Sequence, residues 1–231
     1  MYKVDDDYPL YFLDDFEFPN PYENFCDGLA GASNDLHPQR LLNGYSKGFF
    51  PWYKTQEGSF HWYNIDKRMI LYTDKVKKTK NLNKKLRSQN WDFSINQEFE
   101  AVIENCATIK RPIHMGDGTW ISEEFKEAYT NLHKLGYAIS VESYYKGELV
   151  GGLYGVGIGK YFSGESMFAQ KSDASKLALI YFCELCYENG IKWIDCQSGS
   201  EHLQRMGAEI IPKTQFLDML QKAINVRENN K

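Results

Sequence analysis

The strongest constraint on the fold is a glycine-interrupted run of strand-forming residues at 149–168, LVGGLYGVGIGKYFSGESMF. Residues 137–145 and 148–154 alternate with period two, and Lys146 and Gly147 between them are typical of a hairpin turn. Residues 160–163 add a third expected strand. Glycine inside a strand marks a bulge, a bend or a place where a ligand comes close to the backbone. The run therefore predicts an antiparallel sheet with a reactive pocket at Glu165, the acidic residue that lies among these glycines.

The composition is that of an ordinary globular chain, because 42% of the 231 residues are hydrophobic and 25% are charged. This length suits one large domain or two small ones. No apolar run approaches the roughly 18 to 20 residues that cross a bilayer, and the acidic N-terminal segment lacks the features of a signal peptide. We therefore expect a cytoplasmic protein, with its five cysteines reduced.

Apolar residues at helical spacing predict helices over residues 36–47, 99–106, 125–135 and 174–188. Gly48 and Gly136 are expected to end the first and third of these, and Ser122 to cap the third. A short apolar strand at 191–197 follows the last helix and ends in Asp195, Cys196 and Gln197. Antiparallel strands, a crossover helix and a further strand together indicate an α+β fold.

Charge is unevenly distributed: the net charge is −4 and the first 35 residues are acidic, but residues 75–87 form a basic block. Such a block can attract a phosphate backbone, but from the charges alone it is more often the solvated face of a helix. Cys183 and Cys186 form a CxxC inside an apolar helical run, which favours buried thiols over metal ligands. Cys196 is expected to face the core, because alternation directs its side chain away from those of its neighbours.

Five motifs occur in order along the chain: GLAGASNDLHPQRLLNGYSKGFFPWY (28–53), GTWISEEFKEAYTNLHKLGYAISVE (118–142), GELVGGLYGVGIGKYFSGESMF (147–168), ASKLAL (174–179) and IDCQSGSEHLQRMGAEIIP (194–212). Together they resemble the successive signatures of the leucyl/phenylalanyl-tRNA–protein transferase family. The resemblance implies a small N-terminal α+β domain, which we place at residues 1–71. It also implies an acetyltransferase-like (GNAT-type) catalytic domain at residues 72–231, with a mixed sheet flanked by helices.

The same resemblance implies a reaction: leucine or phenylalanine moves from aminoacyl-tRNA to proteins with N-terminal arginine or lysine. The product is an N-degron, a destabilising N-terminus that leads to protein degradation. The partners expected are therefore aminoacyl-tRNA and such protein substrates, and we expect no membrane, metal or cofactor. Aminolysis of an ester by an amine requires no covalent enzyme intermediate, but both substrates must be held at once.

By resemblance, Asp195 and Gln197 are the catalytic residues. Glutamine is a poor base, so Gln197 is interpreted as a positioning group and Asp195 as its electrostatic partner or as the base. Glu165 is assigned to the cationic acceptor, which needs a fixed carboxylate. The predicted aminoacyl pocket is formed by Leu153, Phe162, Met167, Leu179, Phe182 and Ile194, most of which, taken alone, would pass for plain core residues.

For tRNA, the resemblance assigns Trp52 and Trp120 to the 3′ adenosine and the basic block to the acceptor stem. The predicted contacts of the block are Lys77, Lys78, Lys80, Lys84, Lys85 and Arg87. The N-terminal half departs most from the family pattern, since a tryptophan-rich run of the family appears here as HWYNIDKR (61–68).

Two rival functions stay open on the sequence alone. An acetyltransferase that uses acyl-coenzyme A would share the sheet, but QKSDA at 170–174 does not resemble a pyrophosphate loop. A non-catalytic RNA-binding module would account for the basic block and the aromatic residues, with Asp195 merely structural.

Overall fold

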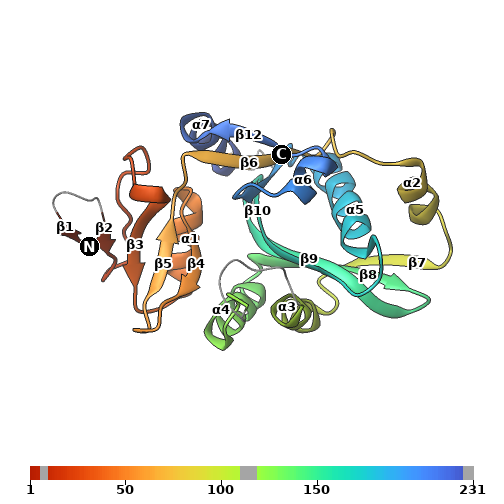
Figure 1. Ribbon diagram of the computed structural model, residues 1–231, viewed down its shortest axis with the longest axis horizontal. Coiled ribbons are helices and arrows are strands. Elements are labelled where there is room, and N and C mark those ends of the chain that lie inside the picture. The colour runs from red at the N-terminus through yellow and green to blue at the C-terminus, as the bar shows by residue number, and fades with distance from the viewer. Residues whose placement is uncertain (6–9, 110–118, 226–231) are drawn as a thin grey trace, which may run out of the picture.

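The computed structural model describes residues 1–5, 10–109 and 119–225, which form two sheets (Figure 1). The smaller sheet has the order β1-β2-β3-β5-β4. Its strands are β1 (Tyr2–Asp5), β2 (Leu10–Phe12), β3 (Leu29–Ser33), β4 (Phe50–Lys54) and β5 (Phe60–Tyr63). A short 3₁₀ helix, η1 (Cys26–Gly28), precedes β3.

The larger sheet is mixed and has the order β12-β6-β11-β10-β9-β8-β7. Its strands are β6 (Lys67–Tyr72), β7 (Trp91–Ile95), β8 (Ala138–Tyr145), β9 (Glu148–Ile158), β10 (Tyr161–Ala169), β11 (Trp193–Gln197) and β12 (Glu209–Pro212). The predicted hairpin is confirmed: Lys146 and Gly147 join β8 to β9 with positive φ angles of 55° and 85°. The predicted third strand is present as β10 but extends beyond Ser163 to Ala169.

Helices cover both faces of the larger sheet (Figure 1). α3 (Phe99–Thr108) and α4 (Glu123–Lys134) lie on one face, and α5 (Ala174–Glu188) lies on the other. α2 (Lys80–Leu86), α6 (Glu201–Met206) and α7 (Lys213–Ile224) complete the helices of the described residues. The predicted α+β class, with a mixed sheet flanked by helices, is confirmed.

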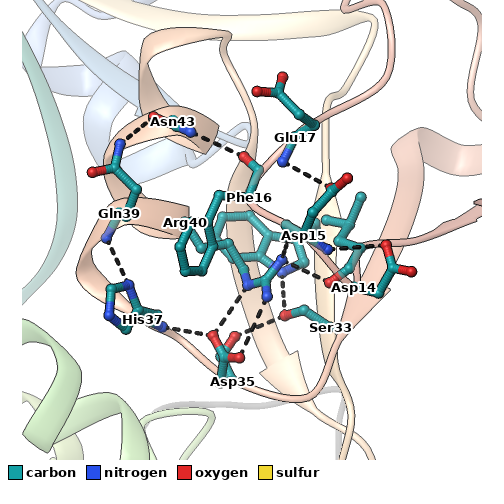
Figure 2. Close-up of polar contacts among 12 residues, drawn as sticks. Asp14, Asp15, Phe16, Glu17, Ser33, Asp35, His37, Gln39, Arg40 and Asn43 are labelled. Carbon is teal, nitrogen blue, oxygen red and sulfur yellow. Dashed lines mark hydrogen bonds and ion pairs between the residues drawn. The ribbon is translucent and has the colours of Figure 1, made fainter. Parts of the chain in front are cut away.

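α1 (Pro38–Ser46) packs beside the smaller sheet and begins two residues later than the predicted position 36. The reason is local: the His37 side chain accepts a hydrogen bond from the Gln39 N–H, and a proline opens the first turn. Buried Arg40 then fixes the helix by donating to the Asp35 carboxylate and to the carbonyl oxygens of Leu13 and Asp15 (Figure 2). This network attaches the segment that follows β2 to α1.

The chain passes from one sheet to the other between β5 and β6. β6 pairs with β11 and β12, so residues 67–71, assigned to the first predicted domain, lie in the larger sheet. One cluster of buried side chains extends across both sheets and includes Leu41, Phe49, Phe125 and Phe216. The division into two domains stays a prediction, and residues 226–231 of the second lie outside the described residues. None of the helices in the described ranges is long and apolar enough to span a membrane.

Candidate active site

The site forms where two parallel strands separate. β10 and β11 are paired at Ser163 opposite Asp195. A bulge in β10 between Gly164 and Ser166 then inserts Glu165 as an extra residue relative to β9. Opposite the bulge, a Cβ atom at Gly155 would lie 2.1 Å from the carbonyl oxygen of Ser163, so only glycine fits there without a shift. The bulge explains why the predicted strand ended too early. It breaks the alternation of side chains but does not end β10.

A cavity of about 660 Å³ opens beside this bulge. The structure brings all the predicted aminoacyl-pocket residues together in its wall, namely Leu153, Phe162, Met167, Leu179, Phe182 and Ile194. Trp52 and Trp120 also line it, as do Glu165 and Gln197. The cavity thus collects the side chains predicted for three different ligand groups, and their individual roles stay predictions.

Glu165 and Gln197 form a hydrogen-bonded pair in the cavity wall. The Gln197 amide nitrogen lies 2.7 Å from Glu165 Oε1 and 3.1 Å from Ser163 Oγ. Because an ionised carboxylate only accepts hydrogen bonds, this contact assigns the amide nitrogen to Glu165. The amide oxygen of Gln197 is then the acceptor available to a ligand.

Two tyrosines, which the sequence did not indicate as site residues, support Glu165 from behind. Tyr129 on α4 donates to Glu165 Oε2 at 3.0 Å, and its hydroxyl lies 2.5 Å from that of Tyr45 on α1. Burial raises the pKa of Glu165 to about 7, although hydrogen bonds from Tyr129 and Ser163 oppose the rise. Glu165 is therefore a carboxyl that changes its charge near neutral pH.

Asp195 lies outside the cavity wall and is fully buried. Its carboxylate accepts two hydrogen bonds from Arg68, at 2.8 and 2.6 Å, and others from Tyr161 Oη at 2.7 Å and the Gln197 N–H at 2.8 Å. Of the two roles expected for Asp195, this geometry supports the electrostatic partner over the base. Arg68 was not predicted as a residue of the site. Its position directly before the apolar segment MILY was a usable signal, because an arginine that is buried together with such a strand needs a charged partner.

Cys196 does not simply face the core as expected, since it lines the cavity. It follows Asp195 in the strand, and alternation places the two side chains on opposite faces. Burial raises the pKa of the Cys196 thiol well above its usual value, which makes it a poor nucleophile. His202 on α6 also lines the cavity, and its buried Nε2 has no hydrogen-bond partner among the described residues. Both residues add polar atoms to a wall that also contains Glu165, Gln197 and several serines.

The basic block includes α2, which lies near α5. Lys78 pairs with Glu184 of α5, and Lys85 pairs with Asp173 at the start of α5. Two of the six residues predicted for tRNA thus attach α2 and the segment before it to α5, and contact of the block with tRNA stays a prediction. Within the described ranges, no three His, Cys, Asp or Glu side chains gather as a metal site would require.

A largely apolar cavity beside a partly buried carboxyl and an amide suits the transfer of an apolar acyl group, and comparison with known sequences defines the class as tRNA-dependent aminoacyltransferase. The model of leucyl/phenylalanyl-tRNA protein transferase matches residues 70–221, and that of the N-terminal domain of this enzyme matches residues 34–65. The chain belongs to the leucyl/phenylalanyl-tRNA protein transferase family.

Curated relatives agree with this assignment. The leucyl/phenylalanyl-tRNA–protein transferase of Maridesulfovibrio salexigens is 42% identical over 213 residues, which cover 92% of this chain and 88% of the relative. That of Cupriavidus metallidurans is 45% identical over 194 residues, or 82% and 77% of the two chains. Among solved structures, the chain is similar to a GCN5-related N-acetyltransferase from Kribbella flavida, with a TM-score of 0.40 and 11% identity over 79% of this chain and 64% of that one.

Proposed function

We propose that this protein transfers leucine or phenylalanine from aminoacyl-tRNA to the α-amine of proteins that begin with arginine or lysine. The observation that carries the proposal is a single cavity whose apolar wall adjoins the pair of Glu165 and Gln197. An apolar aminoacyl group and a cationic acceptor need these two environments side by side. The product would be a destabilising N-terminus, and the use of aminoacyl-tRNA agrees with the cytoplasmic location expected from the sequence.

In the proposed reaction the amine nitrogen attacks the ester carbonyl carbon of the aminoacyl-tRNA. A C–N bond forms, the bond from that carbon to the ribose oxygen breaks, and the amine proton finally replaces the acyl group on the ribose oxygen. The Gln197 amide oxygen accepts a hydrogen bond from the attacking amine and so orients its lone pair. Ionised Glu165 attracts the positive charge of the acceptor in a partly dry pocket. Asp195 acts at a distance, because its carboxylate does not reach the cavity.

The pocket supports selection of apolar aminoacyl groups by its composition. Leu153, Phe162 and Ile194 are buried in the wall, and their side chains offer a polar group no hydrogen-bond partner. A polar aminoacyl side chain would therefore lose its hydrogen bonds to water, which costs roughly 1 to 3 kcal/mol per group left unsatisfied. Met167 is only partly buried, and its unbranched side chain can adjust to leucine or phenylalanine.

Trp52 and Trp120 support binding of the 3′ adenosine. Both rings line the cavity and are only partly buried, and each packs edge-on against one neighbour: Trp52 against Tyr63 at 5.0 Å, and Trp120 against Phe125 at 5.3 Å. An edge-on neighbour leaves part of a ring face for a base. Stacking of a base on such a ring contributes roughly 1 to 3 kcal/mol.

The test is transfer of radiolabelled leucine from leucyl-tRNA to a peptide that begins with arginine, without ribosomes or coenzyme A. The matched control is the same peptide with alanine first. Labelling of the arginine peptide alone is expected, because only that peptide brings a cationic side chain to Glu165. No labelling together with intact tRNA binding would contradict the proposal and favour an RNA-binding module. Transfer that depends on acyl-coenzyme A would favour an acetyltransferase.

A further inference from the structure

Arg68 is a fully buried guanidinium between the two sheets. Arg68 lies on β6 and forms a bidentate ion pair with Asp195. Its guanidinium carbon lies 4.6 Å from the ring centre of Phe50 and 4.4 Å from that of Phe216. The rings of Phe50 on β4 and Phe216 on α7 thus hold the guanidinium, and its bidentate hydrogen bonds fix the carboxylate of Asp195. A guanidinium held in this way has little freedom to reorient.

The hydrogen bonds from Arg68, Tyr161 and Gln197 together leave the Asp195 carboxylate no capacity for another donor. Asp195 Oδ1 accepts from Arg68 Nε and from the Gln197 N–H, and Oδ2 accepts from Arg68 Nη2 and from Tyr161 Oη. Two carboxylate oxygens accept about four hydrogen bonds in total. The carboxylate is saturated as well as buried, so it does not take a proton from an amine in the cavity.

What Asp195 controls is the backbone of Gln197. Gln197 has a φ of 58°, in the left-handed region that is costly for a residue other than glycine, by about 1 to 3 kcal/mol. It follows a bulge in the pairing of β11 with β6. The hydrogen bond from its N–H to Asp195, at 2.8 Å, stabilises this turn, and the turn directs the amide to Glu165.

We propose that Arg68, acting through Asp195, is the positioning residue that fixes the left-handed turn at Gln197 and thereby holds the Gln197 amide against Glu165. The inference rests on the proposed function, since it assigns Gln197 to the attacking amine. The same guanidinium lies over the ring of Phe50, which lines the cavity two residues before Trp52. Arg68 thus anchors two separate parts of the cavity wall, the turn after β11 and the strand that carries Trp52.

The test compares R68K, Q197A and the double variant R68K/Q197A. Lysine keeps the buried positive charge between the two rings but cannot form the bidentate hydrogen bonds to Asp195. The turn at Gln197 is then held less firmly. We expect kcat to fall roughly 10- to 100-fold in R68K while KM for aminoacyl-tRNA stays within about two-fold. If Arg68 acts through Gln197, the double variant transfers no more slowly than Q197A alone.

A pH profile separates positioning from a merely structural role. Loosening Gln197 removes a donor from the Glu165 carboxylate, so the acid limb of kcat/KM should move to higher pH in R68K, as in Q197A. The other titratable groups around Glu165 are Tyr45, Tyr129 and Asp195, and none of them is changed in R68K. A structural defect would lower the amount of active protein without moving the limb.

Lys213 offers a matched control, because it is also a buried cation between the two sheets. Its Nζ pairs with Asp66 at 2.8 Å, donates to the Glu23 carbonyl at 2.7 Å and lies 5.4 Å from the ring centre of Phe25. K213Q should lower the unfolding temperature and leave kcat and the acid limb of the folded protein unchanged.

Additive losses in R68K/Q197A, or an equal fall in kcat in K213Q, would overturn the role of Arg68. Absence of arginine-dependent transfer by the unchanged protein would instead overturn the proposed function itself.

Discussion

At the scale of single residues, the site depends on the carboxyl group of Glu165, whose surroundings disfavour its ionised form. Glu165 is partly buried and accepts hydrogen bonds from Tyr129, Ser163 and Gln197, none of which carries a positive charge. Burial therefore outweighs the hydrogen bonds and raises its pKa to about 7. A carboxyl held by neutral donors is suited to receive a cation from a substrate.

This environment makes stability depend on pH in a defined direction. The pKa of Glu165 rises from 4.5 in the unfolded chain to about 7 in the folded one, so its contribution to stability is full below pH 4.5 and is lost as the pH rises through 7. The ionised carboxylate then costs roughly 3 kcal/mol at pH 8. E165Q should therefore be more stable than the unchanged protein at pH 8, by up to that amount, and the difference should shrink towards pH 5. Urea unfolding at both pH values measures it, with Glu148→Gln, at an exposed position, as the control substitution.

At the scale of elements, local patterns predicted what local forces decide. The β8–β9 hairpin and α5 were predictable because a turn dipeptide, helical spacing and end signals all lie within a few residues of one another. The bulge at Glu165 hid the second half of β10, since one inserted residue breaks the period of two. Arg68 and Asp195 are 127 positions apart, and no local pattern joins them. The residues of the cavity wall were predicted from the family resemblance. The hydrogen-bond partners of Asp195 and Glu165 could be identified only from the tertiary structure.

The bulge itself can be tested through the glycine that faces it. In G155A the new methyl group would meet the Ser163 carbonyl oxygen at 2.1 Å and the Phe162 ring at 2.5 Å, so β9 and β10 must move apart. We expect a loss of about 1 to 3 kcal/mol in unfolding free energy and a larger fractional loss of transfer, because Glu165 lies on the bulge. Gly157→Ala is the matched control on the same strand, since its nearest neighbour would be 3.4 Å away. Equal unfolding midpoints for the two variants would show that the close approach is not limiting.

At the scale of the whole molecule, the two sheets share the site. Trp52 from β4 and Phe50 beside it line the same cavity as Gln197 from β11, and Tyr45 of α1 supports Glu165 through Tyr129. The smaller sheet therefore supplies part of the cavity wall, and the helix beside it supplies part of the support for the carboxyl. A tRNA that reached this cavity would carry its acceptor stem across the surface outside it, where charge decides the approach.

Binding of tRNA should reveal the basic block through its salt dependence. The net charge of the chain is −4, so attraction of a polyanion needs a local cluster, and Lys77, Lys80 and Lys84 are exposed in the block. Lys78 and Lys85 are left unchanged because they pair with α5. Replacing the three exposed lysines with alanine should weaken tRNA binding and reduce the slope of log K against log salt. The reduction should be roughly 0.7 to 0.9 for each phosphate that the protein no longer neutralises, with kcat at saturating tRNA unchanged.

The control for this prediction is a second set of three exposed lysines outside the block, Lys67, Lys134 and Lys222, whose replacement removes the same charge. If the block binds the acceptor stem, only the first triple should change the slope, because counterions are released where lysines meet phosphates. A slope that falls equally in both triples would mean that the tRNA responds to total charge, and the block would then be only the solvated face of a helix.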